Sequence, residues 1–304
     1  MIYLDNSATT RVLPAAVEAV SQAMSQTYGN PSSLHRLGIY AERVVTRARE
    51  TIAASMSARP DEIFFTGGAT EANNTAIFGA VKARAKRGNR IVTSAFEHPS
   101  VLRCMEQLEG QGFDVIYLTD LTKLDEAITE KTILVSLMAV NNETGAQFPI
   151  KEAAAIIKRK GAPALMHCDA VQAYGKIPLH PKRMGIDLMS VSAHKLYGPK
   201  GVGALYVAKG VNIKPFMLGG GQESGLRSGT ENVPGIAGFG AAVEEIFKNF
   251  AQYQQHLADL GGYLRKKLAE MEGIFIHSPA DAVPYICNIS VPPLNSETVQ
   301  HALE

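Results

Sequence analysis

Lys195 lies between a short apolar stretch and a run rich in glycine, and this combination can do chemistry. The stretch IDLMSVS at 186–192 is apolar and almost uncharged, which is typical of a buried strand. A lysine at the end of such a strand loses water, which lowers its pKa and makes it a better nucleophile. Gly198, Gly201 and Gly203 allow a sharp turn or a close approach to a ligand. From these residues alone, a surface lysine beside an ordinary turn remains the alternative.

Polar residues also follow other apolar stretches of the chain. Gly67, Gly68 and Thr70 follow IFFT, and free N–H groups at a helix start, together with a hydroxyl, favour a phosphate site. His98 follows IVTSAF, and Asp169 follows ALMHC. A carboxylate at the end of a buried strand needs a cation or a capped helix as its partner. Taken singly, these residues are equally explained by a capped turn and a structural histidine.

Amide and hydroxyl side chains complete this set: Asn142 in NNETG, Gln172 in DAVQ, and Ser192 and His194 beside the lysine. NNETG taken alone also fits an ordinary turn. Ligands of open parallel sheets bind beyond the carboxyl ends of the strands, so we expect these residues to meet at one edge. Pyridoxal phosphate needs a lysine for a Schiff base, an acid against its ring nitrogen, phosphate donors and a flat group over its ring. The set therefore predicts a pyridoxal phosphate site rather than a chance collection of polar strand ends.

Strand and helix signals alternate along most of the chain and must position these residues. Apolar residues at helical spacing predict two amphipathic helices, one after Pro14 through Met24 and one from Val45 to Met56. The alternation predicts an α/β fold with a mostly parallel sheet covered by helices, followed by a smaller C-terminal α+β domain that contains GIFIH and YICNISV. We expect strands at 62–66, 90–96, 114–118, 132–140, 164–170 and 186–192, and further helices at 71–86, 98–109, 151–159, 233–249 and 253–270.

Composition excludes several classes of function. The 304 residues are 46% hydrophobic, and 30 basic against 29 acidic residues give a net charge of +1, so we expect no direct nucleic-acid or anionic-membrane partner. The three cysteines are far apart, which argues against a disulfide framework and suits a reducing cytoplasm. No metal site is expected at His167, Cys168 and Asp169, because adjacent strand residues point to opposite faces.

Eight motifs together resemble a known family. The chain resembles the NifS/IscS-type cysteine desulfurases, which are fold type I pyridoxal phosphate enzymes of the class-V aminotransferase family. HKLYGPKG with GNPSSLH is more similar to this group than to the SufS-type branch. The motifs are YLDNSATT, GNPSSLH, GGATEANN, EHPS, NNETG, DAVQAYGK, IDLMSVSAHKLYGPKGVGALY and RSGTEN.

The resemblance implies a role for each matching residue. Lys195 would bind the cofactor and move the proton at the substrate Cα, and His98 would stack on the ring and serve in acid–base steps. Asp169 would pair with the ring nitrogen. The remaining groups would be Gln172 and Asn142 near the phenolic oxygen, Ala69, Thr70, Ser192 and His194 at the phosphate, and Thr230 at the phosphate of the neighbouring subunit.

The resemblance also implies the reaction and the partners. L-Cysteine would become L-alanine, and its sulfur would pass as a persulfide to an iron–sulfur scaffold or a tRNA-thiolating enzyme. A cytoplasmic homodimer with shared sites is expected, without membrane contact. Residues 12–250 would form the pyridoxal-phosphate-binding large domain, and 1–11 with 251–304 would form part of the small domain.

Two family residues have no match in this sequence. The family's nucleophilic cysteine and carboxylate-binding arginine would lie beyond residue 304, and Cys104, Cys168 and Cys287 are expected to be inert buried residues. LNSETVQHALE begins a helix, with Asn295 or Ser296 as N-cap, but shows no end signal, so a truncated chain is expected. Such a chain should bind pyridoxal phosphate without transferring sulfur. The alternatives are another class-V enzyme, such as a selenocysteine lyase or an aminotransferase, and a non-catalytic cofactor-binding scaffold.

Overall fold

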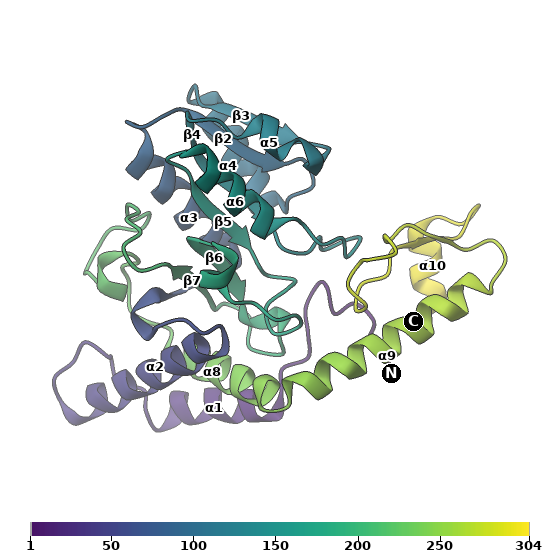
Figure 1. Cartoon of the computed structure of the whole chain (residues 1–304). Helices are drawn as coiled ribbons and strands as arrows, with labels where there is room; N and C mark the ends of the chain where they lie inside the picture. The colour runs from purple at the N-terminus through teal and green to yellow at the C-terminus, as the bar shows by residue number, and fades with distance from the viewer. Residues whose placement is uncertain (1, 304) are drawn as a thin grey trace.

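The computed structural model describes residues 2–303, and its centre is a seven-stranded sheet with helices on both faces (Figure 1). The strand order is β1-β7-β6-β5-β4-β2-β3. Strands β3, β2, β4, β5 and β6 run parallel, whereas β7 is antiparallel to both of its neighbours, β6 and β1. The predicted α/β fold with a mostly parallel sheet is confirmed.

Every predicted strand and helix is present; most ends shift by a few residues, but the helix predicted from Val45 begins at Arg36. The strands are β1 Ile63–Thr66, β2 Arg90–Ser94, β3 Asp114–Leu118, β4 Thr132–Met138, β5 Leu165–Asp169, β6 Leu188–Ser192, β7 Gly203–Val207, β8 Phe275–Ile276 and β9 Ile289–Ser290. The helices are α1 Pro14–Ser25, α2 Arg36–Ser55, α3 Ala69–Arg84, α4 Pro99–Gly110, α5 Leu124–Ala127, α6 Ile150–Lys160, α7 Pro181–Met184, α8 Val233–Lys248, α9 Phe250–Ala269 and α10 Ser296–Leu303. Short 3₁₀ turns include Ala193–Lys195 and Glu223–Gly225.

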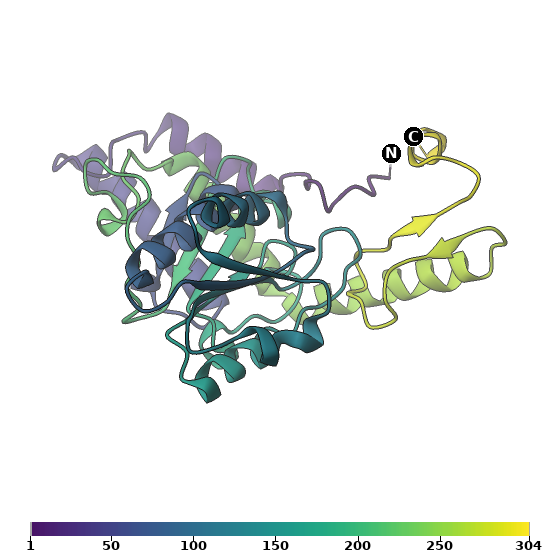
Figure 2. The ribbon, with the colours of Figure 1, turned by 90° about the horizontal axis from the view of Figure 1, so that it is seen from above.

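Side chains of the central strands alternate between two buried clusters, one on each face of the sheet. Ile91 belongs to a cluster with residues of α3 and α4, whereas the next residue, Val92, belongs to a second cluster with residues of α2, α6 and α8. Both faces are therefore dry, which explains why the strands are nearly continuous apolar stretches rather than alternating ones. Figure 2 shows helices on either side of the sheet when it is viewed from above.

Strand β7 was not among the predicted strands. Its sequence, GALYV, follows the glycine-rich run that we interpreted as a turn, and its side chains are buried. The strand closes the gap between β6 and β1, so it connects the segment after Lys195 to the segment before Gly67. Gly203, which opens β7, pairs with the last residue of β1 and with the last residue of β6.

Helix α1 is amphipathic as predicted, but two of its larger apolar residues, Val17 and Met24, do not face the core. Val17 is 53% exposed and Met24 is 65% exposed, whereas the small residues Ala16 and Ala23 are buried against the rest of the chain. Helix α1 packs on α8, and small residues allow two helices to approach closely.

The C-terminal part extends from the sheet along the long helix α9; strand β8 packs on that helix and pairs with β9 (Figure 1). It touches the sheet-bearing part through Val283, whose N–H donates to Gly145 O at 2.9 Å. Asn295 caps α10 as predicted, because its Oδ1 accepts from Thr298 N at 2.8 Å. The division into residues 12–250 and residues 1–11 with 251–304 stays a prediction. None of the helices within 2–303 is long and apolar enough to cross a membrane.

Candidate cofactor-binding site

The predicted site residues come from strands whose carboxyl ends lie at one edge of the sheet. Strands β2, β4, β5 and β6 run parallel, and β1 shares their direction because both β1 and β6 are antiparallel to β7. The segments that follow these strands therefore project from the same edge, where open parallel sheets bind ligands. The predicted convergence at one edge is confirmed by the topology.

A group of free amide N–H donors lies at the start of α3. Within residues 2–303, the N–H groups of Ala69, Thr70 and Glu71 have no hydrogen-bond acceptor, since the first bond into this helix is made by Ala72 N. Gly68 precedes them with a φ of +150°, and a Cβ built on it would meet nothing within 4 Å. Unpaired donors, open space and the positive end of the helix dipole suit a phosphate.

Gly203 brings the end of β6 close to this group of donors. It pairs with Thr66 of β1 on one side and with Ser192 of β6 on the other. A Cβ at this position would lie 2.9 Å from Gly68 Cα and 2.6 Å from Val191 O, so only glycine allows such proximity. Ser192 is buried, and only β7 separates it from Thr66, which ends β1 shortly before the α3 donors.

His194 follows Ser192 and is held in its neutral form. Its Nδ1 lies 3.2 Å from Thr9 Oγ1. Burial, followed by the charges of Lys195, Lys200 and Lys176, lowers the pKa of His194 to about 4. A neutral imidazole offers one donor and one acceptor, and Nε2 makes no hydrogen bond within residues 2–303.

Asp169 is a buried carboxylate without a cationic partner. Its Oδ1 accepts from Val171 N at 3.0 Å, and its Oδ2 accepts from Asn73 Nδ2 at 2.8 Å. Burial raises the pKa of Asp169, while these hydrogen bonds and then the charges of His98 and Lys195 oppose that rise. A buried carboxylate that accepts only from neutral donors is suited to a protonated ring nitrogen, which would supply the missing positive partner.

His98 is both a structural residue and an accessible ring. It is the N-cap of α4, and its Nδ1 accepts from Ser100 N at 3.1 Å and lies 2.8 Å from Ser100 Oγ. Asn73 Nδ2 donates to the same Ser100 hydroxyl at 2.8 Å and also to Asp169, so one chain of hydrogen bonds joins the imidazole to the carboxylate. The ring itself is exposed. His98 can therefore be both the N-cap of α4 and a ring that stacks on a ligand, because the cap uses Nδ1 and leaves the ring face accessible.

Lys195 points toward the N-terminal segment of the chain. Its Nζ donates to Ser7 O at 2.5 Å and to Ala8 O at 2.8 Å. Burial lowers the pKa of Lys195, and the charges of Asp5 and Asp169 oppose this effect. Sequence reasoning missed the two carbonyl groups, although they belong to the YLDNSATT motif. The predicted nucleophile is thus partly desolvated and held beside the edge of the sheet.

The three remaining predicted residues differ in how closely they join this group. Gln172 is buried, and its Nε2 donates to Ser7 O at 2.9 Å, the same oxygen that Lys195 contacts. Asn142 lies half-buried in a turn that the neighbouring Asn141 shapes by accepting from two backbone N–H groups. Thr230 is exposed on the loop after β7 and is not brought to the other residues within this chain. Their roles stay predictions.

The three cysteines lie in different environments. Cys104 and Cys168 are buried as predicted, and burial raises the pKa of Cys104 to about 11 and that of Cys168 well above its usual range. The prediction was wrong for Cys287, which is half-buried because it precedes the short strand β9 at the periphery of the chain. The thiols of Cys104 and Cys168 are therefore poor nucleophiles.

These residues fit pyridoxal phosphate. The open space above Gly68 and the free N–H groups match a phosphate, the uncompensated carboxylate of Asp169 matches a ring nitrogen, and the desolvated amine of Lys195 matches an aldehyde. A fold with a parallel sheet that presents this set at its carboxyl edge is that of a fold type I pyridoxal-phosphate-binding protein.

Comparison with known proteins gives the same class. The family model "Aminotransferase class-V" matches residues 2–304, and the chain belongs to this family. It is 48% identical over 251 residues to a cysteine desulfurase of Trichormus azollae, covering 80% of this chain and 62% of that protein. It is 40% identical over 309 residues to a cysteine desulfurase IscS of Clostridium botulinum, covering 98% of this chain and 77% of that protein. A solved NifS-like protein matches with a TM-score of 0.95 at 40% identity, covering 99% of this chain and 85% of that one.

Proposed function

We propose that the protein is a pyridoxal-phosphate-dependent cysteine desulfurase that converts L-cysteine to L-alanine. The observation that supports this most is that the partly desolvated Lys195 and the uncompensated carboxylate of Asp169 both lie at the carboxyl edge of the sheet. The relatives named cysteine desulfurase supply the choice of substrate. The site residues keep the roles that the sequence predicts, including Gln172 and Asn142 near the phenolic oxygen.

The residues of this chain have distinct tasks in the proposed reaction. When bound, pyridoxal phosphate supplies an electron sink for negative charge at the substrate Cα. Lys195, whose pKa is lowered, moves the proton at Cα, and His98 donates or accepts a proton through Nε2 while Ser100 holds Nδ1. Asp169 holds a proton on the ring nitrogen. The Cβ–S bond of L-cysteine then breaks, Cβ takes up a proton to give alanine, and a cysteine thiolate takes the sulfur as a persulfide.

We further propose that the 304-residue chain binds the cofactor without sulfur transfer. The thiolate that accepts the sulfur must reach the substrate within bonding distance. Cys104 and Cys168 are buried in α4 and β5 with raised pKa values, and Cys287 is half-buried near β9. In the complete reaction, the persulfide sulfur would pass to an iron–sulfur scaffold or a tRNA-thiolating enzyme in the cytoplasm.

The cofactor assignment is tested with the absorption spectrum. The parent protein, mixed with pyridoxal phosphate, should show a visible band that sodium borohydride removes while fixing the cofactor to Lys195. Lys195→Ala should lose the band and the covalent label, whereas Lys200→Ala, which changes an exposed lysine five residues away, should keep both. A normal band and label in Lys195→Ala would contradict the assignment.

The reaction is tested by supplying L-cysteine and measuring free alanine and protein-bound persulfide. We expect a change in the spectrum without turnover in the 304-residue chain. Multiple turnovers with persulfide on Cys104, Cys168 or Cys287 would overturn the proposed lack of sulfur transfer. Alanine from selenocysteine alone, or transfer of the amino group to a keto acid, would instead indicate another class-V enzyme.

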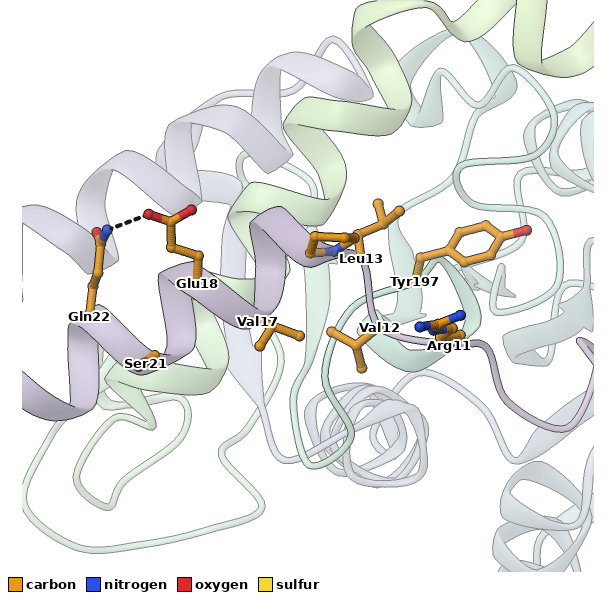
Figure 3. A pocket seen from close by; sticks show the side chains of 9 residues that line it. Arg11, Val12, Leu13, Val17, Glu18, Ser21, Gln22 and Tyr197 are labelled. Carbon is orange, nitrogen blue, oxygen red and sulfur yellow. Dashed lines mark hydrogen bonds between the residues drawn. The ribbon is translucent and has the colours of Figure 1, made fainter.

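We also propose that the protein is a homodimer in which Thr230 reaches the phosphate in the neighbouring subunit. Exposed apolar residues on and after α1 support this: Val17, Met24, Tyr28 and Leu34 are 53%, 65%, 66% and 95% exposed. A groove of about 930 Å³ beside α1, lined in part by Arg11, Val17 and Tyr197, continues this surface (Figure 3). A second copy of the chain would cover these apolar side chains.

Mixed dimers test the role of Thr230 directly. Lys195→Ala and Thr230→Ala subunits each lack one part of the site. If Thr230 acts across the interface, a mixed dimer regains one complete site with parental cofactor affinity. If Thr230 acts within its own chain, no complete site forms and the proposal fails. Met24→Glu should yield monomers in sedimentation experiments, whereas Met271→Glu, at an exposed position in the C-terminal part, should not.

A further inference from the structure

Lys176 is a buried lysine without a carboxylate partner. Its side chain lies after β5 in the DAVQAYGK motif, and the residue is 7% exposed. The Nζ atom donates to Gln172 Oε1 at 3.0 Å and lies 5.1 Å from the centre of the Tyr285 ring. No Asp or Glu within residues 2–303 forms an ion pair with it. Burying a cation in this way costs free energy, so its position requires a physical explanation.

The ammonium group decides which way the Gln172 amide faces. An ammonium only donates hydrogen bonds, so the amide oxygen must face Lys176 and the amide nitrogen must point the other way. At the other end, Ser7 O only accepts, and Gln172 Nε2 donates to it at 2.9 Å. A reversed amide would place its NH₂ group against the ammonium and its oxygen against the Ser7 carbonyl. Both neighbours therefore demand the same orientation.

The orientation matters because of what lies beside Ser7. Ser7 O also accepts from Lys195 Nζ, so the NH₂ group of Gln172 is directed to the side of the site that contains the nucleophile. Tyr285 supports this arrangement through two contacts. The Lys176 ammonium lies over its ring, and its hydroxyl donates to the backbone oxygen of Gln172 at 2.8 Å. Burial, followed by the charge of Lys195, lowers the pKa of Lys176 to about 7.

We infer that Lys176 is a positioning residue, which fixes the Gln172 amide so that its NH₂ group donates toward the phenolic oxygen of the cofactor. The inference rests on the proposed pyridoxal phosphate site. Lys176 does not touch the cofactor in this scheme. It acts through Gln172, and while Lys176 is protonated it keeps a donor available where a free glutamine would present its oxygen part of the time.

The test compares cofactor affinity across a set of variants. Lys176→Met removes the donor and keeps most of the length of the side chain, and we expect it to weaken the affinity about tenfold, as for the loss of one hydrogen bond to a charged acceptor. Lys176→Gln restores a neutral donor and should recover most of that loss. In a Gln172→Ala background, Lys176→Met should have at most about a twofold further effect. A full tenfold effect in that background would overturn the inference, because Lys176 would then act by its charge or through the fold.

A second measurement does not depend on the cofactor. The side-chain NH₂ signals of Gln172 in the apoprotein can be assigned by their absence in Gln172→Ala. In the parent they should be well dispersed and slow to exchange, and in Lys176→Met they should move toward the values of a free amide. Unchanged signals in Lys176→Met would refute the positioning role even if pyridoxal phosphate binds as proposed. Failure of the parent to bind pyridoxal phosphate would refute the proposed function and leave this measurement valid.

Discussion

Replacing Glu223 by alanine should destabilise the protein through the loop that carries Thr230. The Glu223 side chain is 2% exposed and accepts three hydrogen bonds, two from Arg49 at 2.8 and 2.6 Å and one from Phe65 N at 2.8 Å. The loop thereby attaches to α2 and β1. Residues Glu223 and Ser224 have φ values of 47° and 53°, in the left-handed region that favours glycine. The ion pair with Arg49 therefore holds a backbone conformation that these two residues would otherwise avoid.

The size of the effect follows from these contacts. Breaking a buried ion pair by removing one partner costs about 3–5 kcal/mol. Arg49 is 21% exposed and keeps a bond to Ile63 O, which favours the lower end, about 3 kcal/mol. With a urea m-value of about 3 kcal/mol per M, the unfolding midpoint should fall by about 1 M. Glu223→Gln keeps an oxygen for Phe65 N and should lose less.

Urea unfolding followed by circular dichroism measures this shift. Glu106→Ala is the matched control, because it removes an ion pair with Arg103 in which both side chains are at least half exposed. Its midpoint should equal that of the parent. If Glu223→Ala also unfolds at the parental midpoint, the buried pair does not hold the loop, and the reasoning from burial and hydrogen bonding is refuted. If the loop is released, cofactor affinity in the proposed dimer should fall together with stability.

Three further predictions concern single side chains. Asp169→Asn should keep the fold but slow deuterium exchange at the Cα of bound L-cysteine by roughly a hundredfold, the effect of about 3 kcal/mol for a lost buried charge pair; normal exchange would exclude the ring-nitrogen role. Burial raises the pKa of Glu97 from its ordinary value of 4.5 to about 8, so the folded state keeps a proton that the unfolded state releases, and stability should fall as the pH rises through this range. Glu97→Gln should flatten that fall in urea midpoints measured at several pH values, and equal slopes in both proteins would contradict the raised pKa. In the native protein, iodoacetamide should label Cys287 well before Cys104 or Cys168, as peptide mapping would reveal, and the reverse order would be inconsistent with their burial.

The residues that sequence predicts best are those whose signal is local. Asp169 and Lys195 each follow a short apolar stretch, and a polar residue after a strand that is buried on both faces must lie at the edge of the sheet. Because all these strands run in one direction, their ends meet, and the site follows from topology. Strand β7, which lies between β1 and β6, was missed because the glycines that precede it indicate a turn.

Contacts between distant residues had no such signal. Arg49 and Glu223 are 174 positions apart, and each resembles an ordinary charged residue in its own segment. Lys176 stands after a glycine in a turn, which favours a surface position, yet Tyr285 from the C-terminal part covers it. Val17 and Met24 have the helical spacing of a core face, but α8 packs against the small residues beside them. In each case tertiary packing, which single-sequence patterns do not contain, decides the environment.

The charges at the edge of the sheet also indicate what kind of ligand belongs there. Asp169 is a buried carboxylate that accepts hydrogen bonds only from neutral donors, whereas the Gln172 side chain presents an NH₂ donor beside Ser7 O. The free N–H groups at the start of α3 form a second group of donors, at the positive end of the helix dipole. A ligand that matches all three positions must carry one protonated nitrogen and two separate anionic groups. Pyridoxal phosphate has this pattern in its ring nitrogen, phenolic oxygen and phosphate, and a simple anion such as sulfate would compensate only one of the three positions.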